Sequence, residues 1–116
     1  MYLITGCAGF IGFHMCKLLL KKNYKVVGVD NLNPYYSVKY KNHRVSILKK
    51  NKNFIFYKYD LSKKKKIKKI FLDHSFKNII HFAAQPGVIY SYKNPSSYYK
   101  NNVNATKVLI DEIKKK

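Results

Sequence analysis

The sequence has little negative charge: five acidic residues stand against 24 basic ones among 116 residues, which gives a net charge of +19. A surplus of this size attracts polyanions, so a nucleic-acid partner has to be considered. Arginine is almost absent as well, because Arg44 is the single arginine and every other basic residue is lysine. The planar fork of arginine reads guanine and clamps phosphates, and lysine does not replace it.

The lysines are spread along the whole chain, and 63 of the 116 residues are Lys, Asn, Ile, Tyr or Phe. These five amino acids share AT-rich codons, so compositional drift of a genome accounts for the charge without a ligand. We expect non-specific affinity for nucleic acid at low salt and no specific nucleic-acid partner.

Cysteine is scarce, and Cys7 and Cys16 lack metal-ligand spacing, which predicts no metal site and two free thiols in a cytoplasmic chain. No apolar run reaches the roughly 20 residues that cross a bilayer, so no membrane partner is expected. The apolar start, residues 1–13, has no basic residues ahead of it and contains glycines, which argues against a signal peptide. The length indicates one domain at most.

A glycine-rich stretch, Gly6-x-x-Gly9-x-x-Gly12, follows a short apolar run and opens a segment with helical spacing. Glycines between a strand and a helix allow a tight turn, let the backbone approach a pyrophosphate, and let the helix lie against the strand. The free amides of the first helical turn then face the anion. Three glycines in seven residues also fit a plain turn, so the stretch alone leaves both interpretations open.

An acid ends the next apolar run: Asp30 follows Val26–Val29 and comes 18 residues after Gly12. An acid about 20 residues past such glycines is placed to bind a ribose hydroxyl. The alternative is a solvent-exposed acid at a strand end. Asp60 likewise ends a predicted strand, and the carboxyl ends of parallel strands are where ligands bind.

Periodicity predicts four strand–helix units. Strands are expected at 2–5, 25–29, 54–59 and 78–82, helices at 11–22, 38–50, 63–73 and 95–115, and loops at 31–36 and 83–94. Asn23 is expected to end the first helix, Ser37 and Ser62 to cap the second and third, and Pro95 to open the last. The predicted inward faces are Ile11, Met15, Leu18 and Leu19; Val45 and Leu48; Ile67, Ile70, Phe71 and His74; and Tyr99, Val103, Thr106, Ile110 and Ile113. The alternation predicts an α/β fold, a partial Rossmann-type doubly wound parallel sheet of order 3-2-1-4 covered on both faces.

With these residues placed, the chain resembles the N-terminal part of an extended short-chain dehydrogenase/reductase, and more narrowly the NAD-dependent nucleotide-sugar epimerases and dehydratases. The matching segments are 5–12 (TGCAGFIG), 29–32 (VDNL), 59–61 (YDL), 81–85 (HFAAQ) and 102–106 (NVNAT). Residues 30–36 (DNLNPYY) and 85–91 (QPGVIYS) look most like UDP-glucuronate 4-epimerases.

The resemblance implies NAD as cofactor, a nucleotide-sugar substrate for the full-length protein, and a homodimer in that form. It assigns the pyrophosphate to Gly6, Gly9, Phe10, Ile11 and Gly12; the adenosine ribose to Asp30 and Asn31; adenine to Asp60 and Leu61; and the path to the nicotinamide ribose to Phe82, Ala83 and Ala84. It places Gln85 to Ser91 beside the substrate and Asn102 near the active site. Plain strand-end packing at 82–84, and a backbone bond at Asn102, remain the alternatives.

Two positions depart from the family: Ala105 stands where glycine is usual, and Ile89 stands where the glucuronate enzymes have arginine. Loss of that cation weakens the case for a sugar carboxylate. The family's proton transfer requires a Tyr-x-x-x-Lys pair in the next strand–helix unit, and a substrate domain beyond it. Tyr35 and Tyr59 each precede a lysine by four residues, but 11 Tyr and 23 Lys make chance matches expected. We therefore assign no catalytic residue.

The sequence thus supports three hypotheses. In the first hypothesis, the chain is the NAD-binding portion of an epimerase or dehydratase that acts by transient oxidation of a sugar carbon, and it is inactive alone. In the second hypothesis, it is an NAD-binding half-domain without catalysis. The third and weakest hypothesis is a basic nucleic-acid-associated protein.

Overall fold

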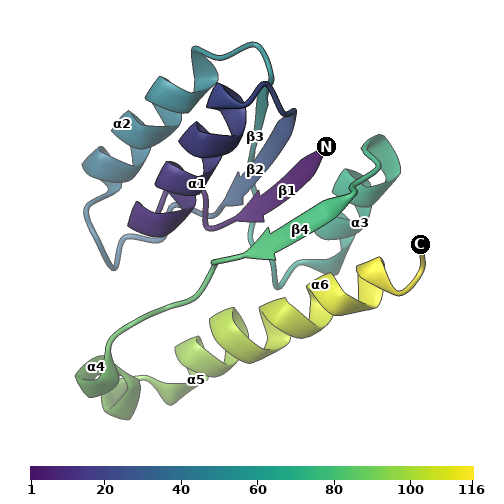
Figure 1. The fold of residues 1–116 in the computed structure, drawn as a ribbon. Coiled ribbons are helices and arrows are strands. Elements are labelled where there is room, and N and C mark those ends of the chain that lie inside the picture. The colour runs from purple at the N-terminus through teal and green to yellow at the C-terminus, as the bar shows by residue number, and fades with distance from the viewer. The chain divides into compact units, whose positions relative to one another are not determined.

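The computed structural model describes residues 1–116. Four strands form one parallel sheet of order β3-β2-β1-β4, as the sequence predicts, with β1 and β2 at its centre (Figure 1). The strands are β1 (Tyr2–Thr5), β2 (Val26–Asp30), β3 (Phe54–Lys58) and β4 (Asn78–His81). The helices are α1 (Phe10–Lys21), α2 (Val38–Lys49), α3 (Lys64–Asp73), α4 (Val88–Lys93), α5 (Pro95–Tyr98), the π-helical η1 (Tyr99–Asn104) and α6 (Ala105–Ile113).

The parallel pairing brings the carboxyl ends of the strands to one edge. Thr5 pairs with Val29 of β2 and with His81 of β4, so the turn after β1 and the residues after β2 and β4 leave the sheet together. This edge is where ligands bind in doubly wound sheets. The chain divides into two compact units, residues 1–58 with 75–83 and residues 59–74 with 84–116.

In the first unit, α1 and α2 lie on one face of the sheet (Figure 1). The expected side of α1 is confirmed in part: Leu19 is buried and Met15 packs against the core, whereas Ile11 and Leu18 are exposed. The other buried residues of the helix are Gly12, Phe13, Cys16 and Leu20. Apolar residues lie almost all round this helix, so hydrophobic spacing alone did not select a face. The core they form includes Ile4, Val26, Leu48 and Phe54.

In the second unit, two expectations are wrong. Residues 83–94 are not all loop, because 88–93 form α4. The predicted helix 95–115 is three segments, and its buried positions are Ala105, Leu109 and Glu112. In α6 each predicted inward residue lies one position after a buried one. The predicted inward residues Tyr99, Val103, Ile110 and Ile113 are exposed. Because α6 carries apolar residues on two sides, apolar spacing alone did not identify its buried side.

The helix ends follow the sequence only in part. Asn23 ends α1 as expected, with a φ of 64°. Ser37 stands at the N-cap of α2 but its side chain caps nothing. Ser62 does not cap α3, because Lys63 is the N-cap and the Ser62 hydroxyl donates to Asp60. His74 lies beyond the end of α3, whereas Ile67, Ile70 and Phe71 form its buried stripe as predicted. None of the helices combines the length and the apolar character that crossing a membrane requires.

Candidate functional site

The turn between β1 and α1 requires glycine at two positions. Gly6 has a φ of +70°, and a Cβ there would lie 2.8 Å from the backbone nitrogen of Ala83. At Gly12 a Cβ would lie only 2.1 Å from the carbonyl oxygen of Gly6, so α1 rests directly on the turn. These two contacts give the turn a physical reason for its glycines beyond chain flexibility.

The N-terminus of α1 is open. Gly9 at the N-cap supplies no side-chain bond, and no acid lies in the first turn. The first bond along the helix runs from the Phe13 amide to the Gly9 carbonyl at 2.9 Å. The amides of Phe10, Ile11 and Gly12 therefore have no partner within the helix, and together with the helix dipole they suit an anion. The side chains of Phe10 and Ile11 point to solvent, 69% and 63% exposed.

Asp30 ends β2 beside this turn, and backbone amides hold its carboxylate. Oδ2 accepts from the Ala8 amide at 3.0 Å and Oδ1 accepts from the Leu32 amide at 2.8 Å. Each oxygen of a carboxylate has a second lone pair, which leaves acceptor capacity for hydroxyl donors. Asp30 is thus a fixed acceptor at the end of β2, and its ribose-binding role stays a prediction.

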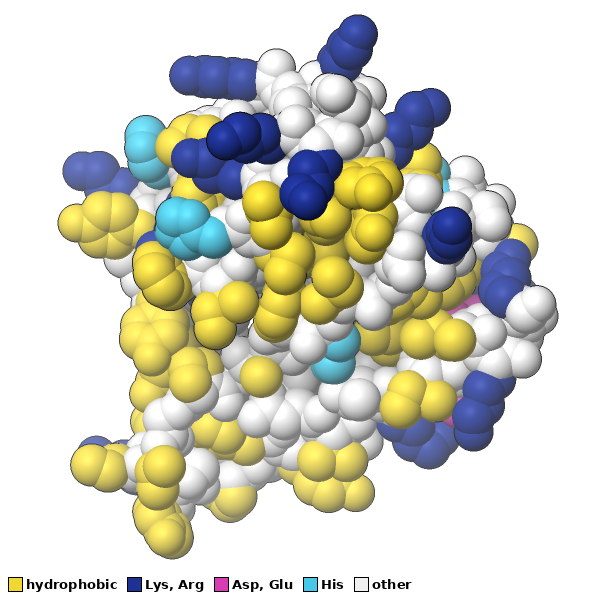
Figure 2. Space-filling view, in the orientation of Figure 1, with side chains coloured by type: hydrophobic (Ala, Val, Ile, Leu, Met, Phe, Trp, Pro, Cys, Tyr) yellow, Lys and Arg dark blue, Asp and Glu magenta, His cyan; other side chains and the backbone are white.

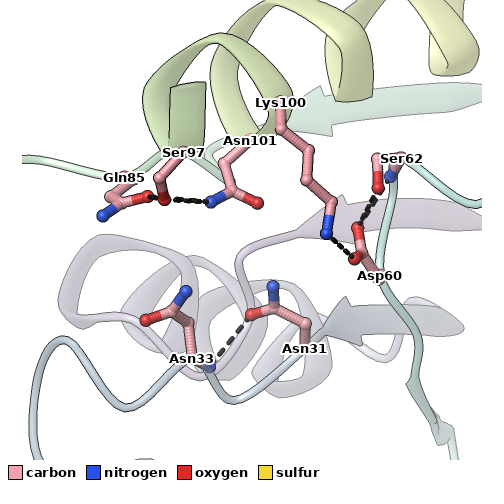
Figure 3. Close-up of polar contacts among 8 residues, drawn as sticks. All are labelled: Asn31, Asn33, Asp60, Ser62, Gln85, Ser97, Lys100 and Asn101. Carbon is pink, nitrogen blue, oxygen red and sulfur yellow. Dashed lines mark hydrogen bonds and ion pairs between the residues drawn. The ribbon is translucent and has the colours of Figure 1, made fainter. Parts of the chain in front are cut away.

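The loop after Asp30 is built from side chains that bond to their own backbone. The Asn31 side chain accepts from the Asn33 amide at 2.9 Å (Figure 3), and the Asn33 side chain accepts from the Tyr35 amide at 2.8 Å. Leu32, which is buried, takes a left-handed φ of 55°. Short Asx turns of this kind give a fixed shape to a loop without regular structure.

Two basic side chains that the sequence did not single out as site residues contact the backbone of the β1–α1 turn and of the loop after Asp30. Arg44 donates from Nη1 to the Ala8 carbonyl at 3.1 Å, and Lys41 donates from Nζ to the Asn33 carbonyl at 2.5 Å. Both lie on α2, three residues apart and therefore on one face. The signal available in the sequence was the single arginine of the chain at helical spacing from a lysine.

Thr5 joins the ends of β1 and β4. Its hydroxyl accepts from the Ala83 amide at 3.2 Å and lies 2.6 Å from Nδ1 of His81. A hydroxyl has one proton and two lone pairs, so that of Thr5 accepts from Ala83 and shares a second hydrogen bond with Nδ1, whose direction follows the tautomer of His81. Burial lowers the pKa of His81. Phe82 packs against the core, so strand-end packing accounts for part of segment 82–84.

In the second unit, Asp60 organises the segment that precedes α3. Its Oδ1 accepts from the amide and the hydroxyl of Ser62 at 2.9 and 2.7 Å, and its Oδ2 lies 3.3 Å from Nζ of Lys100 (Figure 3). Burial acts to raise the pKa of Asp60, but the Ser62 bonds and Lys100 outweigh it and lower that pKa below its usual value. Leu61 is buried. The predicted adenine contacts of Asp60 and Leu61 are not tested by these bonds.

Gln85 is the centre of a second polar cluster. Its backbone amide donates to Oδ1 of Asn102 at 2.6 Å, and its carbonyl accepts from Nδ2 of the same side chain at 3.1 Å. Its side-chain oxygen accepts from Ser97 and, at 2.8 Å, from Asn101 (Figure 3). Asn102 therefore fixes the backbone at Gln85, while its neighbour Asn101, also in η1, bonds to the Gln85 side chain.

The contacts of the remaining predicted site residues give less information about a site. Ala84 is exposed, and the Ser91 hydroxyl donates to the Val88 carbonyl of its own helix. Tyr35 and Tyr59, the two chance matches to Tyr-x-x-x-Lys, lie in a loop and just after β3. Burial, together with Asp30 and Cys16, raises the pKa of Cys7 well above its usual value, and burial raises that of Cys16 to about 12, so neither thiol is activated.

The basic side chains do not gather at one place on the face that Figure 2 shows, where Lys and Arg are scattered among hydrophobic side chains. No group of three or more His, Cys, Asp or Glu side chains comes together. The features suited to bind a ligand are thus, in the first unit, the glycine turn with the open α1 terminus and Asp30. In the second unit they are the two polar clusters around Asp60 and Gln85.

Comparison with known proteins agrees with these features. The chain is 43% identical over 113 residues to a UDP-glucuronate 4-epimerase of Thermodesulfobacterium geofontis. The aligned region covers 97% of this chain and 35% of the relative. A crystal structure of UDP-glucuronic acid 4-epimerase from Bacillus cereus, in complex with UDP-glucuronic acid and NAD, matches with a TM-score of 0.88 and 35% identity, covering 97% of this chain and 36% of that one.

The structure of a UDP-Glc/GlcNAc 4-epimerase from Campylobacter jejuni matches with a TM-score of 0.86 and 34% identity, over 98% of this chain and 33% of that one. The chain thus spans about a third of the length of the relatives it matches. The resemblance to nucleotide-sugar epimerases and dehydratases is confirmed. The family model described as GDP-mannose 4,6 dehydratase matches residues 3–116, and the chain belongs to that family.

Proposed function

We propose that this chain binds NAD and forms the N-terminal, cofactor-binding portion of a UDP-sugar 4-epimerase. The observation that carries the proposal is the Asp30 carboxylate, held by the Ala8 and Leu32 amides beside the uncapped start of α1. An anion site and a fixed hydroxyl acceptor at the carboxyl edge of a parallel sheet are the two parts that a dinucleotide needs. Relatives crystallised with NAD support the same choice.

The residues fit this cofactor. A Cβ at Gly9 would lie 3.3 Å from the Gly6 carbonyl oxygen and within 4 Å of no other atom outside its immediate chain neighbours, so a pyrophosphate bound there would meet bare backbone. The amides of Phe10, Ile11 and Gly12 would bind it, and Asp30 with Asn31 would hold the adenosine ribose. Asp60 and Leu61 would contact adenine, and Phe82, Ala83, Ala84 and Asn102 would border the nicotinamide half.

For the longer protein we propose a nucleotide-sugar substrate that lies against Gln85 and Ser91. Bound NAD would supply the hydride acceptor that reversible oxidation of a sugar carbon requires. The proton acceptor and the substrate domain would lie in the part of the relatives that this chain does not span. A glucuronate-like sugar is supported by the relatives, although Ile89 offers no cation to a carboxylate. We also propose a homodimer and, from the two buried free thiols, a cytoplasmic location for that protein.

The experiment is a titration of the purified chain with NAD at physiological salt. Binding is measured by calorimetry and by the change in melting temperature. Saturating NAD at about 100 times its Kd should stabilise the fold by about 2.7 kcal/mol. Gly9→Val should abolish this binding without unfolding the chain, because φ at Gly9 is −73°, which valine adopts, while the branched side chain fills the pyrophosphate space.

Leu18→Val is the matched control, since Leu18 lies on the exposed side of the same helix. It should bind NAD like the unmutated chain. Normal NAD binding by a folded Gly9→Val variant would mean that Gly9 only shapes the turn. Binding that disappears as salt rises from low to physiological concentration would favour non-specific attraction by the charge of +19.

A further inference from the structure

A run of lysines covers the solvent-facing side of α3. Although lysines occur along the whole chain, six of the seven residues at positions 63–69 are lysine, and all six are exposed. The next longest uninterrupted run of lysines has three members, at 114–116. Positions 63–69 are therefore the densest concentration of positive charge in the sequence, and they are called the lysine run below.

The packing of α3 fixes the direction in which the lysine run faces. Ile67, Ile70 and Phe71 are buried, and they form the apolar stripe that holds the helix in the second unit. The lysines therefore occupy the remaining sides of a helix that cannot turn them inward. The ammonium of Lys66 lies over the ring of Tyr59, 4.9 Å from its centroid, and this cation–π contact holds one member of the run in place.

The local electrostatics of α3 oppose this arrangement. The N-terminus of a helix carries partial positive charge, yet the first turn of α3 holds lysines and no acid. Lysines three or four positions apart on one helix also repel one another, as Lys68 does with Lys65 and Lys64. An anion bound at this end of α3 would offset both unfavourable contributions.

The acids of the chain do not neutralise the lysine run. Asp73 pairs with Lys69 at 3.4 Å, towards the end of the helix. The other three ion pairs of the chain use lysines outside α3. Asp60, the acid that precedes the run, pairs with Lys100 (Figure 3). The five lysines other than Lys69 therefore form no ion pair and are available to an external anion.

The composition of the run indicates which kind of polyanion fits it. Positions 63–69 extend about 9 Å along the helix axis, which corresponds to about three phosphates of one nucleic-acid strand at roughly 3.4 Å each. A helix that binds an anionic membrane inserts an apolar face, but the apolar face of α3 is buried and Leu72 is its one exposed apolar side chain. The run contains no arginine, which is the side chain suited to reading bases.

We propose that the lysine run of α3 is a docking surface for the phosphate backbone of nucleic acid, which it binds without selecting a base sequence. Contacts to phosphates position a nucleic acid but carry no sequence information. The proposal is independent of the proposed binding of NAD, so either can fail without the other. It assigns the non-specific affinity expected from the charge of the chain to one helix, with a Kd of about 1 to 100 µM at physiological salt.

The test is the binding of a labelled single-stranded RNA of about 12 nucleotides, measured by fluorescence anisotropy from about 0.05 to 0.2 M salt. The triple variant Lys64→Gln, Lys65→Gln and Lys68→Gln should bind more than about tenfold less tightly at about 0.15 M salt. The slope of log affinity against log salt should fall by about 2, because each lost phosphate contact removes about 0.7. An unchanged affinity and slope would overturn the proposal.

The matched control is the triple variant Lys21→Gln, Lys22→Gln and Lys25→Gln. These lysines are exposed, belong to no ion pair, and their replacement removes the same charge from the chain. The control should change the affinity less than about threefold, because charges farther away than a Debye length of about 8 Å are largely screened. Equal losses in the two variants would assign the effect to overall charge and refute a docking surface on α3.

The melting temperatures of the same variants test the electrostatic argument. The α3 variant should melt no lower than the unmutated chain, because the substitutions remove repulsion between like charges. A lower melting temperature would mean that these lysines stabilise the helix, and it would contradict the argument that an anion is needed there.

Three competition measurements distinguish other modes of binding. A second RNA of unrelated sequence should bind with an affinity within about twofold of the first, and a strong preference would contradict docking through the backbone. Saturating NAD should not displace the RNA, since displacement would place the RNA in the dinucleotide site and overturn the assignment to α3. Vesicles of equal parts phosphatidylserine and phosphatidylcholine should compete only weakly, and efficient competition would replace nucleic acid by a membrane as the partner.

Discussion

Alanine at Gly12 should destabilise the fold, because α1 rests on the turn at that point. A Cβ there would lie 2.1 Å from the carbonyl oxygen of Gly6, 2.8 Å from its carbonyl carbon and 3.1 Å from the Cα of Cys7. All three atoms belong to the backbone, so no side chain can rotate away. Relief to an ordinary contact of 3.4 Å requires α1 to move by more than 1 Å relative to the turn.

The size of the effect follows from two opposing contributions. Overpacking of a well-packed site costs about 1 to 3 kcal/mol, and the backbone clash places Gly12→Ala at or above the upper end. Replacement of glycine by alanine within a helix returns about 1 kcal/mol. We expect a net loss of about 2 kcal/mol or more in the free energy of unfolding, or a fall in melting temperature on the order of 8 °C.

The assay is thermal and urea unfolding, with Gly9→Ala as comparison. At Gly9 the added Cβ would meet only the Gly6 carbonyl, at 3.3 Å, and the backbone φ is ordinary. Its cost at the N-cap should stay below about 1 kcal/mol. If Gly12→Ala melts at the temperature of the unmutated chain, α1 does not rest on the turn as described and the reasoning fails.

Three further outcomes are expected. Thr5→Val should lower the free energy of unfolding by about 1 to 3 kcal/mol, because the Ala83 amide loses its acceptor and Nδ1 of His81 loses its hydrogen-bond partner, whereas Thr5→Ser should restore most of the loss in urea unfolding. Asp60→Asn should cost about 1 kcal/mol or less at pH 7, since the site is partly solvent-screened. Because the pKa of Asp60 is lowered in the folded state, its contribution to the free energy of unfolding is present above the unfolded pKa of about 3.9 and is lost as the pH falls through the folded pKa. The free energies of unfolding of the variant and of the unmutated chain should therefore converge in acid. A constant difference between them from pH 7 to pH 3 would contradict this sign. Tyr35→Phe and Tyr59→Phe should leave epimerase turnover of the longer protein unchanged, and a large loss of turnover in either would identify a proton acceptor within this chain.

The sequence by itself determined the fold class, the strand order and the family. Parallel β-α alternation has few topologies, so apolar runs and one glycine-rich turn were enough to predict the order 3-2-1-4. Gly6 and Gly12 could be singled out by their place between a strand and a helix, and Asp30 by its spacing from them at the end of the next strand; the structure gives physical reasons for the two glycines. The bounds of α1, α2 and α3 were predictable to within a few residues, whereas α4 was expected as loop and the last predicted helix is three segments.

The buried residues Val45 and Leu48 of α2 and the buried stripe of α3 were predicted from spacing, but only the tertiary structure decided the buried sides of α1 and α6 and which side chains meet. Helix α1 is apolar on most sides, so spacing predicted only part of its buried face, and the buried residues of α6 lie one position before the predicted ones. The bonds of Arg44 to the turn and of Asn102 to Gln85 join residues 36 and 17 positions apart. Such contacts depend on how elements pack against one another, and a local pattern of residues carries no information about that packing.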